Sequence, residues 1–122
     1  MLALNNFQIR LVLVLVANFL LANVAHATFY QSTTMAEYCR EYSKFIAIEK
    51  SVSQYEAGIC AGFVASTIEL MDLSERLCKR DELNLDSVVE KYINQVESRD
   101  EAKKNSATFV LVDVLQSSHA CE

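Results

Sequence analysis

Between residues 34 and 73 the spacing of apolar positions predicts two helices. The first begins at Thr34, where TMAE has the form of an N-terminal capping box, and ends near Glu49. The second begins at Ser53, in another capping box, and continues to about Leu73. Apolar residues occupy more than one face of this second stretch, which is typical of a central, buried helix.

Two further helices are predicted after a charged connection. Residues 74–84 carry many charges without periodicity and predict an ordered loop. From Leu85 to Val96 the apolar residues follow the i, i+3, i+4, i+7 pattern of one helix face. A capping box at 98–101 opens a fourth segment that continues to about residue 116, and its run TFVLVDVL is rich in β-branched residues. That run could form a strand, but a lone strand has no partner, so we favour a helix.

The first 27 residues have the pattern of a signal peptide. Arg10 precedes an apolar run from Leu11 to Ala22, which is shorter than the roughly 20 residues that span a bilayer. The small residues of Ala-His-Ala at 25–27 fit signal peptidase cleavage after Ala27. We therefore expect a single exported mature domain at 28–122, without membrane attachment. An uncleaved N-terminal anchor is the alternative.

Charge narrows the range of partners. The segment 1–27 contains one of the 11 basic side chains and none of the 16 acidic ones, so the mature domain has a formal charge of −6. An acidic domain is a poor ligand for nucleic acid. Its surface suits a basic protein partner or simply keeps the domain soluble.

The cysteines Cys39, Cys60, Cys78 and Cys121 predict two disulfides, as is usual in small exported domains. Zinc is the alternative, but the cysteines are too widely spaced for a zinc site. In antiparallel hairpins, Cys39 and Cys60 lie about 10 residues either side of the first turn, and Cys78 and Cys121 about 21 either side of the second. We expect these two pairings. The predicted fold is an all-α bundle of about four helices in two hairpins.

Gly58 and Gly62 are the two glycines of the chain, and both lie inside the second predicted helix. An interior glycine costs a helix about 0.5 to 1 kcal/mol relative to alanine. With Ala61 and Ala65 they form a stripe of small residues beside Cys60. We expect a neighbouring helix to pack closely on this stripe, either as plain core packing or for a functional reason.

Enzymatic activity is not expected. If all four cysteines are bonded, none can act as a nucleophile, and His119, the only mature histidine, lies close to Cys121. The acid pairs at 81–82 and 100–101 are typical of surface charge. We expect no catalytic residue, no cofactor and no metal site. Asp113, between two valines, is either the polar edge of a helix or a charge that faces a partner.

The order of these motifs resembles the Rap/Tai-type immunity proteins. YEAGICAGFVAS at 55–66 matches the family's Y-x-A-G-x-C-x-G-aromatic stretch, VVEKYI at 88–93 matches the helix after its third cysteine, and Cys121 matches its near-terminal cysteine. These proteins protect bacteria with type VI secretion from their own peptidoglycan amidase effectors. The resemblance implies a periplasmic, all-helical, often dimeric protein that binds a secreted amidase and blocks its active-site groove.

The turn between the third and fourth predicted helices is the first choice for a partner-binding surface, because polar loops on a rigid scaffold often carry binding groups. A solvated turn is the alternative reading of the same residues, since Ser98 and Glu101 also form a capping box. A periplasmic acid-stress chaperone of the small, helical, disulfide-bonded type is the second function that stays open. The predicted binding residues are Glu97, Ser98, Arg99, Asp100 and Glu101.

Overall fold

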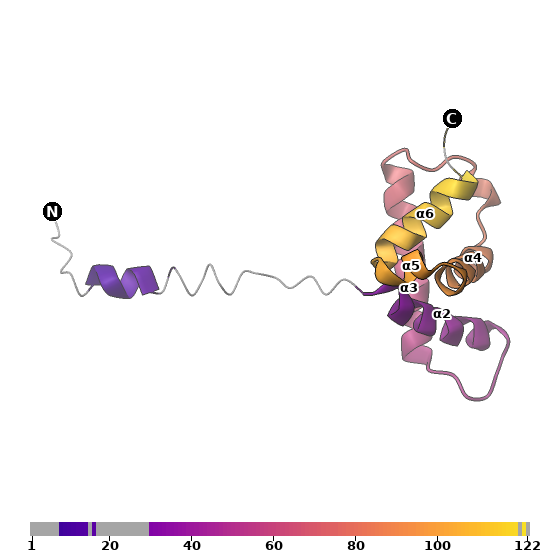
Figure 1. Cartoon of the computed structure of the whole chain (residues 1–122), viewed down its shortest axis with the longest axis horizontal. Helices are drawn as coiled ribbons and strands as arrows, with labels where there is room; N and C mark the ends of the chain where they lie inside the picture. Colours follow the sequence, from indigo (N-terminus) through magenta and orange to yellow (C-terminus); the bar gives the residue numbers. More distant parts are fainter. Residues whose placement is uncertain (1–7, 15, 17–29, 120, 122) are drawn as a thin grey trace.

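The computed structural model describes residues 8–14, 16, 30–119 and 121. The first of these ranges, with residue 16, is helical and belongs to the predicted signal peptide, whose cleavage site after Ala27 lies outside the described residues. In the part of the chain that is described, no helix is long and apolar enough to cross a membrane. The other elements are α2 (Ser32–Ile46), α3 (Gln54–Leu73), the 3-10 turn η1 (Arg80–Glu82), α4 (Leu85–Ser98), α5 (Asp100–Lys104) and α6 (Ala107–His119), as Figure 1 shows.

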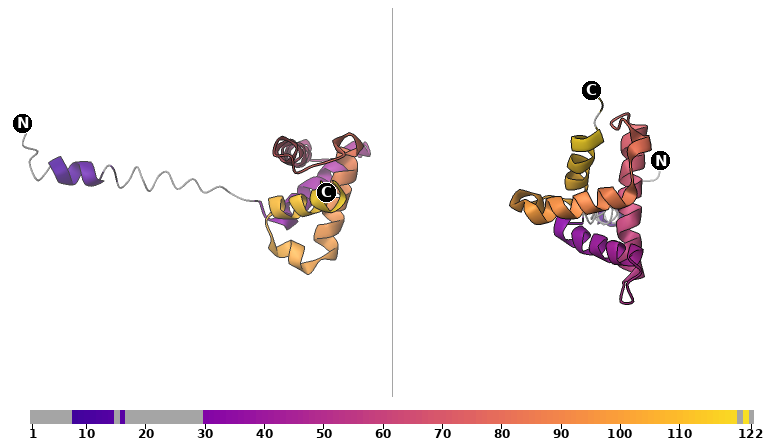
Figure 2. Two further views of the ribbon diagram at one scale, coloured as in Figure 1. Left: turned by 90° about the horizontal axis from the view of Figure 1, so that it is seen from above. Right: turned by 90° about the vertical axis from the view of Figure 1, so that its right-hand side faces the viewer.

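The domain is all-α, as predicted, and α3 forms one side of it. In the right-hand view of Figure 2, α2, α4 and α6 all lie on the same side of α3. Helix α2 makes the most extensive contact with α3, and α4 crosses α2 and α6. The core fills the space between these helices, and its largest fully buried side chains are Tyr92, Met35, Leu111, Leu115 and Val64.

The predicted start of the first helix was wrong by two residues. Helix α2 begins at Ser32, and its N-cap Gln31 makes no side-chain capping bond. The earlier start follows from pairing with the other end of the chain, because the Ala107 N–H donates to the Tyr30 carbonyl at 2.9 Å. The helix also ends before the predicted Glu49. Its end is followed by residue 48, an exposed isoleucine with a left-handed φ of 57°.

Ser53 is the N-cap of α3 as predicted, but its capping box is only half formed, because the Ser53 N–H donates to Glu41 and not to Glu56. The Ser53 hydroxyl accepts from the Glu56 N–H at 3.3 Å. The capping box predicted at 98–101 is not formed. Ser98 instead ends α4, and Arg99, in an extended conformation, separates α4 from α5. The fourth predicted helix is therefore two helices. They are interrupted because the Asn105 carbonyl accepts from the Ser32 N–H at 3.2 Å, which directs the backbone away from helical geometry.

The favoured helix over TFVLVDVL is confirmed, because this run lies within α6. Both disulfide pairings are confirmed as well. Cys39 of α2 is bonded to Cys60 of α3 with Cα atoms 5.0 Å apart, and Cys78 is bonded to Cys121 with Cα atoms 4.9 Å apart. Two disulfides indicate folding in an oxidising compartment, such as the periplasm or the extracellular space.

The expected packing on the glycine stripe is contradicted. Gly58 and Gly62 are exposed, and a Cβ added to either would meet no atom within 4 Å. The physical reason is the rotation of α3 about its axis: Cys60 points to α2 and the core, and at 100° per residue the glycines point away from it. The buried residues of α3 are Ala57, Cys60, Val64, Thr67, Ile68 and Met71.

Candidate protein-binding site

The end of α4, the short helix α5 and the start of α6 meet at a corner that faces away from α3. In the right-hand view of Figure 2 this corner lies at the far left, on the side opposite α3. A hollow of about 260 Å³ opens between these three helices. We call it the corner hollow, and it is lined by Gln95, Arg99, Glu101, Ala102, Asn105, Phe109, Val110 and Asp113.

Buried hydrogen bonds hold the corner in place. The Ser32 hydroxyl donates to the Ala102 carbonyl at 2.6 Å, and the Tyr92 hydroxyl donates to the Ser32 carbonyl at 3.0 Å. Ser32 and Tyr92 are fully buried, and burial raises the pKa of the Tyr92 phenol. A buried polar group without a hydrogen-bond partner destabilises the fold. These bonds therefore hold α5 against the start of α2, and the start of α2 against the middle of α4.

The five predicted binding residues are exposed, but they do not share one environment. Glu97 forms an ion pair with Arg40 of α2 at 2.7 Å, and Asp100 forms one with Lys103 at 3.3 Å. The ion pair between Glu97 and Arg40 connects α4 to α2, so we assign Glu97 a structural role. Ser98 is exposed at the end of α4 and does not line the hollow.

Arg99 and Glu101 are the predicted residues that the structure brings together in the corner hollow. Neither side chain takes part in a salt bridge within the described part of the chain. Exposed charges of both signs are thus available at this site. They offer donors and acceptors to the backbone and side chains of another protein.

Phe109 is the main residue of the site that the sequence analysis missed. Its side chain is 62% exposed at the rim of the corner hollow. The signal was present in the sequence, because in a helix Val110, Leu111 and Val114 share one face and leave Phe109 outside it. Treating TFVLVDVL as a uniform apolar run concealed that difference.

Asp113 lies on the exposed edge of α6, as one of its two interpretations proposed. Its carboxylate accepts a hydrogen bond from the Gln95 side-chain amide of α4. Both residues line the corner hollow, and their hydrogen bond connects α4 with α6. The carboxylate therefore adds a second negative charge beside Glu101.

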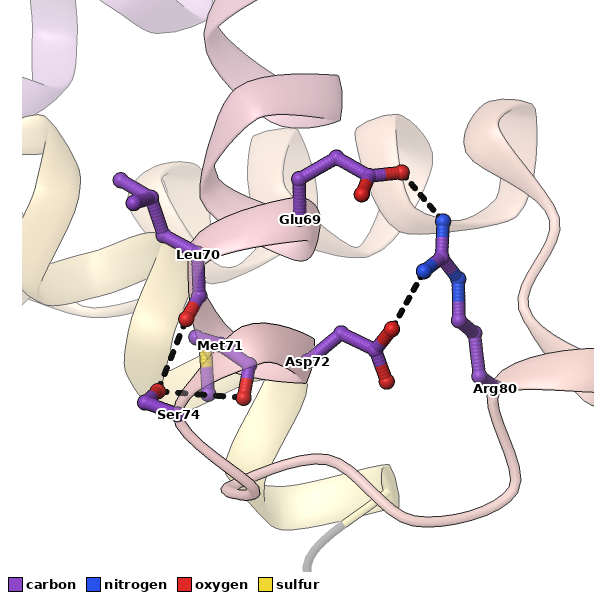
Figure 3. A network of polar contacts seen from close by, with 6 residues as sticks. All are labelled: Glu69, Leu70, Met71, Asp72, Ser74 and Arg80. Carbon is purple, nitrogen blue, oxygen red and sulfur yellow. Dashed lines mark hydrogen bonds and ion pairs between the residues drawn. The ribbon is translucent and has the colours of Figure 1, made fainter.

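The charged loop between α3 and α4 is held against the fold. Arg80 forms ion pairs with Glu69 and Asp72 of α3 (Figure 3), and these contacts raise the pKa of the Arg80 guanidinium. Leu77 is buried, and the Cys78 N–H donates to the His119 carbonyl at 2.8 Å. The loop is thus anchored through its middle, at residues 77–80, which makes it a poorer candidate than the corner for insertion into a partner.

The corner hollow is lined by polar, charged and aromatic side chains of the kinds that bind other proteins. Among the described residues, no three histidine, cysteine or acidic side chains are grouped so that they could hold a metal ion. Searches against family models, curated proteins and solved structures found no match to this chain. The fold and the site define a small, disulfide-bonded helical domain with a polar hollow rimmed by an exposed aromatic side chain.

Proposed function

We propose that this protein is a periplasmic immunity protein that binds and inhibits a type VI-secreted peptidoglycan amidase effector. It has no enzymatic activity of its own, and it protects the cell that produces the effector. The observation that carries the proposal is the corner hollow, in which an exposed phenylalanine lies beside unpaired charges on a rigid projecting corner. The resemblance of residues 55–66 and 88–93 to the Rap/Tai-type family supports the identity of the target.

The chemistry of the corner suits an inhibitor. Aromatic and arginine side chains are enriched in protein interfaces, and Phe109 and Arg99 both line the corner hollow. A peptidoglycan amidase has a groove that accepts a peptide, and a projecting corner can enter such a groove where a flat surface cannot. Fixed positions also reduce the entropy lost on binding, because α5 is already held by Ser32.

Calorimetric titration of the amidase into variants of the corner tests this proposal. We expect Arg99→Ala combined with Phe109→Ala to weaken binding by about 100-fold, because two interface anchors are lost. The melting temperature should stay nearly unchanged, since both side chains are exposed.

The matched control is Glu90→Ala with Lys91→Ala. These residues are exposed on α4 and do not line the corner hollow. The control should bind like the wild type. Wild-type affinity in the corner variant would show that the amidase binds elsewhere, and the proposed site would be wrong.

A further inference from the structure

The two disulfides of this domain lie in different surroundings. Cys39–Cys60 joins α2 to α3, and both of its residues are fully buried. Cys121 is exposed and Cys78 is half-buried, so the bond between them can be reached from solvent. Thiol–disulfide exchange requires an attacking thiolate to reach a disulfide sulfur. In the folded protein the Cys78–Cys121 bond meets this condition and the Cys39–Cys60 bond does not.

The loop that carries Cys78 is also held in a strained conformation. Lys79, the next residue, has a left-handed φ of 58°, and Glu75 near the start of the loop has a φ of 56°. Such a conformation costs a residue with a Cβ atom roughly 1 kcal/mol or more. Breaking the Cys78–Cys121 bond lets this backbone relax, which favours the open form.

Other contacts keep the loop beside α6 when this disulfide is open. Leu77 is buried in the core, and the Cys78 N–H donates to the His119 carbonyl at 2.8 Å. Two residues further on, Arg80 is paired with two carboxylates of α3 (Figure 3). Opening of the bond is therefore a local event, and the two cysteines stay close enough to bond again.

We propose that Cys78–Cys121 is a site of thiol–disulfide exchange with an external dithiol, such as that of a disulfide oxidoreductase. One thiolate attacks the sulfur of Cys121, the more exposed cysteine, and Cys78 leaves as a thiolate. The second thiol of the reagent then displaces Cys121 and closes the dithiol into its own disulfide. The two protons of the dithiol pass to Cys78 and Cys121, so the dithiol is oxidised and the protein disulfide is reduced. Cys39–Cys60 stays bonded throughout.

The charges next to Cys78 favour this direction of attack. Arg76 lies two residues before the cysteine and Lys79 directly after it, and both are exposed. Neighbouring cations stabilise a thiolate, and a stabilised thiolate is the better leaving group. The nearest acidic residues in the sequence, Glu75 and Asp81, are each three positions from Cys78. Exposure and charge therefore both make Cys121 the attacked sulfur and Cys78 the leaving one.

Reduction of the wild-type protein with dithiothreitol, followed by alkylation and mass spectrometry, tests the proposal. We expect Cys78 and Cys121 to be alkylated roughly 100-fold faster than Cys39 and Cys60, because the buried bond reacts only when the core opens. Urea below the unfolding transition should speed reduction of the buried bond and leave the rate at the exposed bond nearly unchanged. Equal rates for the two bonds, or the same urea dependence, would overturn the proposal.

Glutathione locates the attacked sulfur, because a monothiol leaves a mixed disulfide that acid quenching preserves. The adduct should be found on Cys121, and oxidised glutathione should then restore the bond to Cys78 with the helical circular dichroism unchanged throughout. An adduct on Cys78 alone, or loss of the helical signal on reduction, would contradict the proposed exchange. None of these results bears on amidase binding, since Cys121 follows the end of α6 and the corner hollow lies at its start.

Discussion

The corner hollow and the open face of α3 differ in what they offer to a partner. The corner presents Arg99, Glu101 and Asp113 around one exposed phenylalanine, on helix ends that project from the domain. The open face of α3, the surface that is turned away from the rest of the domain, presents exposed tyrosine, leucine and small side chains, and Glu69 on this face is paired with Arg80. Charged, projecting groups suit a groove in a different protein, whereas the mostly apolar open face offers a partner few charges.

The two surfaces also depend on different supports. Beneath the open face, Cys60 fixes α3 to α2 through a buried disulfide. The corner is held by the hydrogen bonds of Ser32 and Tyr92. A change at one support should therefore affect one surface more than the other.

Removal of a disulfide is the largest expected perturbation. We expect Cys39→Ala with Cys60→Ala to lower the free energy of unfolding by about 3 kcal/mol or more, because the constraint on the unfolded chain is lost. The Cys78→Ala with Cys121→Ala pair should cost about 4 kcal/mol, since it closes a longer loop of 43 residues. Urea denaturation measures both. The variant without the Cys78–Cys121 disulfide should still bind the amidase at temperatures where it stays folded. Loss of binding under those conditions would show that the corner depends on this disulfide.

Ser32→Ala is expected to have the next largest effect and to act on the corner. The substitution removes one of the two hydrogen bonds that the Ala102 carbonyl accepts and leaves the one from the Asn105 N–H, which costs about 0.5 to 1.5 kcal/mol. Amidase affinity should fall with it, because α5 loses this bond to the start of α2. Ser43→Ala, which removes a bond from an exposed hydroxyl to the Cys39 carbonyl, is the control. A stable Ser32→Ala variant with normal affinity would contradict the role of Ser32.

Gly62→Ala tests whether Gly62 is free of packing within the chain. The free energy of unfolding should rise by about 0.5 to 1 kcal/mol, because alanine favours the helix and its methyl group meets no atom. Chemical denaturation of the wild type and the variant measures this difference. A destabilised variant would mean that Gly62 is packed within the chain.

Low pH should reduce the stability that Glu41 gives to the turn between α2 and α3. We expect this change in the free energy of unfolding to be the smallest of those predicted. Glu41 accepts from Lys44 at 2.6 Å and from the Ser53 N–H at 2.8 Å, and these bonds hold the pKa of its carboxyl below the usual 4.5. A lowered pKa means that the stabilisation is complete above about pH 4.5 and is lost as the pH falls through the lower, folded-state pKa. Thermal melts of the wild type and Glu41→Gln between pH 7 and pH 3 should therefore converge in acid. A difference that stays constant over this range would rule out Glu41 as the cause.

Much of the fold followed from local signals in the sequence. Periodicity predicted α3 and α4 because their buried faces are continuous, and the symmetric positions of the cysteines about two turns predicted both disulfides. The start of α2 and the break between α5 and α6 did not follow. Both depend on the pairing of Tyr30 and Ser32 with residues 105–107, more than 70 positions away, and no local pattern contains that contact.

The site was predictable in part for the same reason. The polar turn was visible as a run of charges, so Arg99 and Glu101 were found. Whether a charged side chain lines the hollow or forms an ion pair depends on the neighbouring helix. Glu97, for example, pairs with Arg40 of α2. The glycines were recognised as unusual, but their direction depended on the rotation of α3, which Cys60 fixes by its bond to α2.

The most direct test of the proposed division between the two surfaces is the rate at which the amidase cleaves peptidoglycan in the presence of two variants. The Arg99→Ala, Phe109→Ala variant binds more weakly, so inhibition of the amidase should require about a 100-fold higher concentration of it than of the wild type. Gly62→Leu, which disrupts only the open face, should inhibit the amidase like the wild type. Full inhibition by the corner variant, together with lost inhibition by Gly62→Leu, would contradict the assignment and place the amidase on α3.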